Sequence, residues 1–295
     1  MRAFSLFLVF LSSVSLVGQH RVRVDRSAMG TPWSVIVYAT DTLTARKWVE
    51  AAFARIEAVE QSMSDYRTDS EINRLVRRTP RMYHPVSCDL YRVLRFSRAL
   101  ARRSGGAFDP TVGPLSKLWR RAIRHQTLPT EEELRQAGTR VQWKYLRLRR
   151  PNRVWLARDD LQLDLGGVAK GYALDAAGDV LRSAGLDCFL IDGGGDLLLG
   201  APPPGRTGWE IQTPDGPVTA ARVAIATSGA EYRHLEWEGR RYSHLVDPRT
   251  GLGIAAPRPV TVMAPRAMVA DGLASAVSVM EEEAGHRLLR RYGLQ

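Results

Sequence analysis

The sequence predicts a mixed α/β fold, in which helices flank β-sheets with much antiparallel pairing. Three features of the 295 residues indicate it. Apolar residues recur at helical spacing, short strands dominate the second half, and no internal repeat or low-complexity linker divides the chain. The hydrophobic content of 44% is ample for a core in one large domain or in two lobes. The mixture fits either an α/β or an α+β arrangement.

The chain begins with an apolar run from Phe4 to Val17, which is too short for a comfortable membrane span and suits a secretory signal. Ser13–Ser15 offers a cleavage site of the small-x-small kind. We expect residues 1–18 to be a signal peptide, with an uncleaved anchor as the alternative, and residues 19–295 to form the functional domain. A signal implies export, to the periplasm or to the outer face of the cytoplasmic membrane.

The net charge of +11 suggests a nucleic-acid partner, because basic proteins bind phosphate backbones. No aromatic-rich strand motif or zinc spacing accompanies the arginines, which are spread along the chain. A basic solvated surface is the better interpretation, and attraction to an acidic ligand or membrane surface is the weaker one. Cys88 and Cys188 could pair in an exported protein, but two cysteines make no disulfide framework, and Cys188 suits a buried position.

In the first half of the chain, alternation predicts a strand, and apolar residues spaced by three and four predict a long helix. A serine can cap a short helix, and a glycine pair ends the next one. The expected elements are a strand over Trp33–Ala39, a helix from Trp48 to Met63, a short helix capped by Ser70, a helix from near Ser87 to before Gly105, and a helix starting at Pro129–Glu132.

In the second half, leucines alternate before a glycine pair, and a helix with one apolar face follows. Short strands then dominate until a proline precedes the terminal helix. The expected elements are a strand over Leu161–Leu165, a helix over Ala173–Ala184 stopped by Gly185, strands at Cys188–Ile191, Trp209–Thr213, Val223–Ala226, Tyr232–Trp237 and Val260–Met263, and a helix over Met268–Met280.

The stretch from Asp164 to Tyr172 carries the strongest functional signal. It runs through Gly166-Gly167 into a helix, and such a turn bares backbone N–H groups at the positive end of the helix dipole, which suits a phosphate. Lys170 can reach that phosphate, and a lysine is electrostatically unfavourable at a helix start, which favours a functional role. The spacing is not G-x-G-x-x-G, and no acidic residue takes the ribose role, so a Rossmann site is disfavoured.

Asp271 and Ser275 lie four residues apart on the predicted terminal helix, so their oxygens project from the same side. A carboxylate and a hydroxyl one turn apart can bind a hard cation, whose shell phosphate oxygens and waters usually complete. Taken alone, Asp271 is more simply a helix-start residue. Together with the glycine turn and Ala107–Thr111, the pattern predicts a nucleotide site that carries a metal.

Other residues have a functional and a structural interpretation. Phe108 can stack on a ring and Asp109 can accept a hydrogen bond from one, although a core phenylalanine and a turn aspartate before Pro110 are the default interpretations. His244 is a candidate base because Asp247 is close in sequence, while a lone histidine at a strand end is more often structural.

These residues fall in blocks that resemble the ApbE family of FAD:protein FMN transferases. The resemblance covers nearly all of the chain beyond the apolar run, and the order of the blocks makes it specific in a way that no single block is. The six blocks are Met29–Thr31, Met63–Glu71, Ala107–Leu115, Asp164–Asp175, Ser243–Gly251 and Ala270–Ser275.

The resemblance implies a two-lobed α/β fold that binds FAD between its lobes together with Mg²⁺. It implies that the main-chain carbonyl of Ala169 and the side chains of Asp271 and Ser275 hold the metal. The implied reaction transfers FMN from FAD to a Thr or Ser hydroxyl of a partner flavoprotein and releases AMP. Asp271 and His244 are our candidate catalytic residues, with His244 helping to deprotonate the incoming hydroxyl. The implied FAD contacts are Met29, Tyr66, Ala107, Phe108, Asp109, Gly166, Lys170 and Leu245.

The chain departs from the family pattern in two places. Ser275 stands where threonine is usual, which keeps the hydroxyl but loosens its rotamer. Trp119–Ala122 replaces a glycine-containing apolar stretch of the family. The family's contacts to the cofactor edge or to a partner therefore do not carry over to these residues.

Three other functions are alternatives: an FAD pyrophosphatase giving FMN and AMP, a non-enzymatic flavin-binding protein, and an exported nucleic-acid-binding protein. Asp271 and Ser275 favour the two enzymes over a passive carrier, which has no need of a catalytic cation. Salt-sensitive DNA binding without FAD binding would support the nucleic-acid hypothesis. Only an acceptor hydroxyl on a partner separates the transferase from the pyrophosphatase.

Overall fold

The computed structural model describes residues 18–214, 216–229, 234–237, 240–255 and 259–294. Within these ranges, no helix combines the length and the apolar character that a bilayer crossing requires. The predicted signal peptide lies outside the described residues, apart from Gly18.

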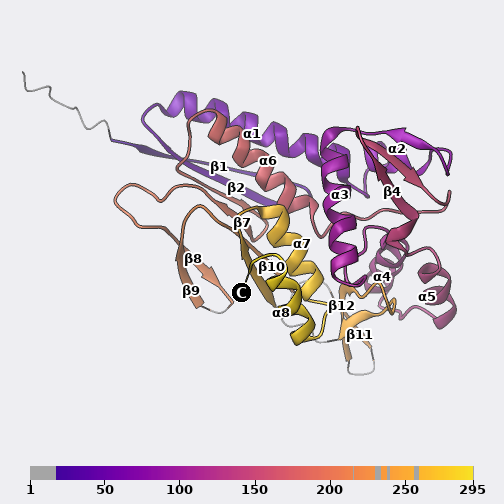
Figure 1. Cartoon of the computed structure of the whole chain (residues 1–295). Helices are drawn as coiled ribbons and strands as arrows, with labels where there is room; N and C mark the ends of the chain where they lie inside the picture. Colours follow the sequence, from indigo (N-terminus) through magenta and orange to yellow (C-terminus); the bar gives the residue numbers. More distant parts are fainter. Residues whose placement is uncertain (1–17, 215, 230–233, 238–239, 256–258, 295) are drawn as a thin grey trace, which may run out of the picture.

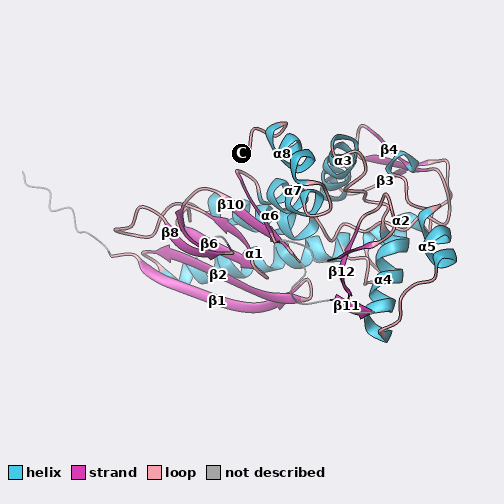
Figure 2. Cartoon of the chain, turned by 90° about the horizontal axis from the view of Figure 1, so that it is seen from below, coloured by secondary structure: helices cyan, strands magenta, loops and turns pink. Residues whose placement is uncertain are grey.

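A six-stranded sheet forms one part of the molecule, in the order β1-β2-β6-β7-β10-β14, and each neighbouring pair is antiparallel (Figures 1 and 2). Helices α1, α6 and α7 cover one face, and the β8–β9 hairpin covers part of the other. The bounds are β1 His20–Ala28, β2 Thr31–Ala39, α1 Thr42–Met63, α6 Ala169–Ser183, β6 Phe189–Gly193, β7 Asp196–Leu199, β8 Trp209–Thr213, β9 Gly216–Ala220, β10 Ala224–Ser228, β14 Val260–Ala264 and α7 Ala267–Val277.

Side-chain alternation in β2 explains why the sheet is covered on both faces. Trp33 and Val35 belong to the main core beneath the helices, whereas Ile36 packs with Trp209 of the hairpin. The predicted mixed α/β fold is therefore confirmed. The strands of the large sheet pair antiparallel, as the short strands of the sequence predicted.

The second part of the molecule holds the remaining helices and two three-stranded sheets, ordered β3-β5-β4 and β11-β12-β13. Both views place it at one end of the large sheet (Figures 1 and 2). Its elements are α2 Glu71–Val76, β3 Tyr83–Pro85, α3 Cys88–Arg103, α4 Gly113–His125, α5 Glu131–Gly138, a 3₁₀ turn Trp143–Tyr145, β4 Leu146–Arg149, β5 Arg153–Leu156, β11 His234–Trp237, β12 Arg240–Val246 and β13 Gly253–Ala255. The last helix, α8 Glu282–Arg290, contacts α7.

The chain crosses between the two parts repeatedly. Residues 64–70 lead from α1 into the second part, and residues 157–168 return to α6. A later excursion leaves after β10 and rejoins the large sheet at β14. Tyr66 and Gly166 lie on the first two crossings, so the topology gathers predicted site residues at the junction.

Helix caps were among the most accurate local predictions. The hydroxyl of Ser70 accepts a hydrogen bond from the N–H of Asn73, and that of Ser87 accepts one from Leu90. The helix predicted at Pro129–Glu132 is α5, which Thr130 and Glu133 begin with a reciprocal capping box.

The predicted strand over residues 161–165 is wrong. Leu161, Leu163 and Leu165 are all buried, as their alternation required, but the segment joins no described strand. Its backbone bond runs from the N–H of Asp164 to the carbonyl of Pro110, at 2.9 Å. Alternation therefore indicated which side chains are buried and did not indicate strand pairing.

Three further elements differ from expectation. The structure adds β1 and α4, and the terminal helix ends at Val277, after which Glu281 precedes the separate helix α8. In α4, Leu115, Trp119 and Ala122 form a buried stripe between arginines, a helical pattern that the surrounding charge obscures. Both cysteines are free; Cys88 is exposed and Cys188 is only half-buried.

Candidate functional site

The glycine turn before α6 is the centre of the site. The carbonyl of Leu165 accepts hydrogen bonds from the N–H groups of Val168 and Ala169, and the carboxylate of Asp164 accepts one from Gly166 at 2.8 Å. No side chain caps this helix start. Fewer N–H groups are free for a ligand than the sequence suggested, because neighbouring residues already use several of them.

Asp271 reaches this turn from α7. Its carboxylate accepts the N–H of Gly171 at 2.9 Å, and a Cβ atom on Gly171 would lie 2.3 Å from the carbonyl oxygen of Ala267. Only a glycine lets the two helices approach so closely. Burial first, and then the charge of Asp196, raise the pKa of Asp271 to about 7, while Lys170 acts in the opposite direction.

Ser275, one turn further along α7, contacts the glycine turn itself. A Cβ atom on Gly167 would lie 2.8 Å from the hydroxyl oxygen of Ser275 and 3.2 Å from the ring of Phe108. Asp271 and Ser275 therefore face the same helix start, as their four-residue spacing predicted. Ala169, the first residue of α6, follows Gly167 by two residues, and its N–H donates to the carbonyl of Leu165.

These residues suit a hard cation. In the part of the chain that the structure describes, no cluster of three or more His, Cys, Asp and Glu side chains could hold a metal. A cation here would rest on mixed oxygen donors: the Asp271 carboxylate, the Ser275 hydroxyl and the Ala169 carbonyl. Because burial destabilises the ionised form of Asp271, a hard cation bound beside its carboxylate would offset that cost.

Lys170 forms an ion pair with Asp196, the first residue of β7. Burial alone would lower the pKa of Lys170, but the carboxylates of Asp196 and Asp271 outweigh it and raise the pKa. The side chain is a half-buried cation beside the glycine turn, where a phosphate could still reach it. Asp196 was not among the predicted site residues, although a half-buried lysine favours such a counter-charge and Asp196 closes a glycine-rich turn.

Tyr66 lies on the first crossing and is 68% exposed. The guanidinium of Arg120 lies 4.4 Å from the centre of its ring and bridges the carboxylates of Asp65, at 2.5 Å, and Asp164, at 2.8 Å. Burial and the charge of Asp164 raise the pKa of Asp65, against the opposing effect of Arg120. The sequence marked Arg120 only as part of an unusual stretch.

Ala107, Phe108 and Asp109 are all buried. One oxygen of Asp109 accepts the N–H and the hydroxyl of Thr111, at 2.8 and 2.7 Å, and the other accepts the N–H of Trp143 at 2.8 Å. Burial raises the pKa of Asp109, and these hydrogen bonds oppose the rise. Asp109 thus has the turn role that was its default interpretation, and its contact to a ligand ring stays a prediction.

The last three predicted residues lie away from the glycine turn in sequence. Met29 occupies the β1–β2 turn with φ of 50°, and its N–H donates to the carboxylate of Glu60 at 3.0 Å. Leu245 is half-buried in β12. His244 also belongs to β12, but its side chain lies outside the described residues. Asp247, its expected partner, pairs with Arg249 at 2.7 Å.

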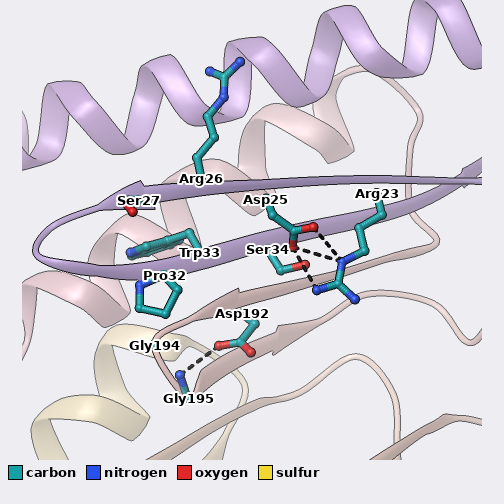
Figure 3. A pocket seen from close by; sticks show the side chains of 10 residues that line it. All are labelled: Arg23, Asp25, Arg26, Ser27, Pro32, Trp33, Ser34, Asp192, Gly194 and Gly195. Atoms are coloured by element: carbon teal, nitrogen blue, oxygen red, sulfur yellow. Dashed lines mark hydrogen bonds and ion pairs between the residues drawn. The ribbon is translucent and has the colours of Figure 1, made fainter.

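A cavity of about 480 Å³ lies elsewhere, where β1, β2 and β6 run side by side (Figure 3). Two pairs of its polar groups bond to each other: Arg23 donates to Asp25 at 2.9 Å, and the N–H of Gly195 donates to Asp192 at 2.8 Å. None of the predicted site residues lines this cavity, so the junction with Asp271 and Lys170 is the better candidate site.

Known proteins resemble this chain over most of its length. The sequence profile of the ApbE family matches residues 29–295. The FAD:protein FMN transferase of Vibrio cholerae is 31% identical over 299 residues, covering 95% of this chain and 89% of the relative. The FAD:protein FMN transferase of Treponema pallidum is 31% identical over 303 residues, covering 93% and 84%.

Two solved structures share the fold. The flavin transferase ApbE from Vibrio cholerae superposes with a TM-score of 0.81 at 30% identity, covering 93% of this chain and 92% of that one. The apo form of the Pseudomonas stutzeri flavinyl transferase ApbE gives a TM-score of 0.83 at 27% identity, with coverages of 94% and 90%. The chain therefore belongs to the ApbE family, as its six sequence blocks predicted.

Proposed function

We propose that this protein is a Mg²⁺-dependent FAD:protein FMN transferase, which moves FMN from FAD to a Thr or Ser hydroxyl of a partner flavoprotein and releases AMP. The names of its relatives support flavin transfer. The observation that carries the proposal is the meeting of Asp271, Ser275 and Lys170 at one glycine turn. Two oxygen donors and a half-buried cation are what a pyrophosphate with a metal ion needs.

Each residue has a distinct part in this proposal. Asp271, Ser275 and the Ala169 carbonyl would hold Mg²⁺, which supplies charge neutralisation at the pyrophosphate. Lys170 is placed to contact a phosphate oxygen, and Asp196 keeps it charged and oriented. Ser275 retains the hydroxyl that a metal ligand requires, although it lacks the methyl group of the usual threonine.

The reaction is a phosphoryl transfer. The acceptor hydroxyl attacks the phosphorus nearer riboflavin, the bond to the second phosphate breaks, and AMP leaves with that oxygen. The hydroxyl proton needs an acceptor, and His244 stays our candidate for that role. With water in place of the hydroxyl, the same site would act as an FAD pyrophosphatase. The acceptor protein, the export of the chain and a membrane-surface association also stay predictions.

The test is Mg²⁺-dependent release of AMP from FAD, followed by chromatography in the presence of an acceptor flavoprotein. We expect Asp271→Asn to lower the rate by about a hundredfold or more, because the charge that holds the cation is gone. An asparagine still accepts the N–H of Gly171, so the variant should fold. The control is Asp179→Asn, which removes a half-exposed carboxylate from α6 away from the turn. Undiminished AMP release by Asp271→Asn would contradict the metal assignment.

A further inference from the structure

Arg120 joins three segments that the chain keeps far apart in sequence. It projects from α4, and its two terminal nitrogens bond to Asp65 on the first crossing and to Asp164 before the glycine turn. These partners are 55 and 44 residues away in sequence. One side chain therefore fixes the first crossing relative to the turn that leads to Lys170.

The environment of this bridge makes Arg120 hard to replace. The side chains of Asp65 and Asp164 are only 10% and 8% exposed, and their charges repel each other across the guanidinium. Without Arg120, two largely buried carboxylates would face each other with no cation between them. The second oxygen of Asp164 accepts the N–H of Gly166, so the bridge also fixes the backbone of the glycine turn.

The third contact of Arg120 is the ring of Tyr66. The guanidinium lies over one face of the ring at 4.4 Å, while the side chain as a whole remains 68% exposed. The cation over one face restrains the position of this exposed ring. Its open surface can accept a flat ring, at a position set by the same bridge that fixes the glycine turn.

We propose that Arg120 is a positioning residue that holds Tyr66 as a stacking platform for a flat ring of FAD, at a set distance from the pyrophosphate site. This inference rests on the proposed function, because it takes FAD to be the ligand. Arg120 touches neither the phosphates nor the acceptor in this proposal. It acts on the ligand through Tyr66, whose ring it anchors to Asp164, and it thereby places the ring end of the ligand site relative to the phosphate end.

The experiment measures the affinity of the full-length protein for FAD by titration of flavin fluorescence, with Mg²⁺ present. Arg120→Met removes the bridge, and the double variant Arg120→Met with Asp65→Asn also removes one of the unpaired carboxylates. Arg120→Lys keeps the charge but cannot hold both carboxylates and the ring together. The matched control is Arg121→Met, on the same helix, which loses an exposed pair with Glu133.

We expect the double variant to stay folded by circular dichroism and to bind FAD about tenfold more weakly, with Arg120→Lys between it and the wild type. Arg121→Met should bind like the wild type. Competition titrations with FMN and with AMP identify which ring of FAD stacks on Tyr66. The competitor that carries this ring should bind the double variant more weakly than it binds the wild type.

A double-mutant cycle with Tyr66→Ala tests the route of the effect. If Arg120 acts through the ring, its removal in the Tyr66→Ala background should change FAD affinity by less than about twofold. An undiminished tenfold loss in that background would overturn the proposal, as would wild-type affinity in the folded double variant. A wild-type protein that binds no FAD would instead refute the proposed function.

Discussion

The buried carboxylates of this protein join elements that are distant in sequence. Asp175 of α6 accepts the N–H groups of Ala267 and Met268 at the start of α7, at 2.9 and 3.1 Å, and Asp271 of α7 accepts that of Gly171 in return. The two helices are thus held by a reciprocal pair of carboxylate-to-backbone bonds. Such bonds compensate part of the cost of burying the charge.

Asp89 offers a pH-dependent test of this kind of link. At the start of α3 it accepts the hydroxyl of Tyr172 at 2.5 Å and pairs with Arg55 at 2.6 Å, so it joins three helices. Burial opposes its ionisation, but the hydrogen bonds from Tyr172 and Arg55 outweigh burial and lower the pKa of Asp89 below 3.8.

A carboxylate whose pKa is lower in the folded than in the unfolded protein stabilises the fold at pH values above its unfolded-state pKa. That stabilisation is lost as the pH falls through its folded-state pKa. We therefore expect Asp89→Asn to reduce the free energy of unfolding by about 1–2 kcal/mol at neutral pH. The deficit should shrink as the pH falls below the ordinary aspartate value of 3.8 and through the lower folded-state pKa. Urea unfolding of both proteins across this range measures it, and a deficit that does not change with pH would refute the assignment.

Local spacing made some site residues predictable, whereas long-range pairing hid others. Asp271 and Ser275 could be placed together because four residues are one helical turn. Arg120 could not be assigned a role, since its carboxylate partners lie 55 and 44 residues away and only the folded chain brings them together. The same holds for the pairing of Lys170 with Asp196.

Among the secondary-structure elements, the approach of α6 to α7 sets the geometry of the site. Besides Gly171, Gly272 permits close packing: a Cβ atom there would lie 2.7 Å from the ring of Phe96 in α3. Helices α3, α6 and α7 therefore meet through glycines. This close packing brings Asp271 and Ser275 to the helix start.

We expect Gly171→Ala to destabilise the protein by about 3 kcal/mol and to reduce Mg²⁺-dependent turnover, because the added methyl group must push α7 and Asp271 away. Thermal unfolding and AMP release measure the two effects. Gly138→Ala in α5 is the control, since a Cβ atom there meets nothing within 4 Å and alanine favours a helix. Equal stability of the two variants would show that the helices tolerate a wider separation.

Element prediction succeeded where the signal was local and failed where pairing decided the outcome. The Ser70 cap of α2, the starts of α3 and α5 and the helical period of α1 depend on neighbouring residues, and the structure confirms them. Residues 161–165 have the alternation of a strand, but no described strand lies in position to pair with them. Their burial comes from packing at the junction.

For the whole molecule, the central feature is the junction between the large sheet and the second part (Figure 1). Repeated crossings bring Tyr66, the glycine turn and α7 to it, although they span more than half of the chain. The mixed fold class followed from composition and periodicity. The junction did not, because no composition shift marks a boundary in the sequence.

The most direct test of the central claim is the mass of an acceptor. The purified protein, FAD and Mg²⁺ are incubated with a flavoprotein fragment carrying an acceptor threonine, and intact-mass spectrometry follows. We predict an acceptor heavier by one FMN unit, one AMP released for each acceptor modified, and no gain when the threonine is replaced by alanine. Free FMN and AMP beside an unmodified acceptor would contradict transfer and identify the pyrophosphatase.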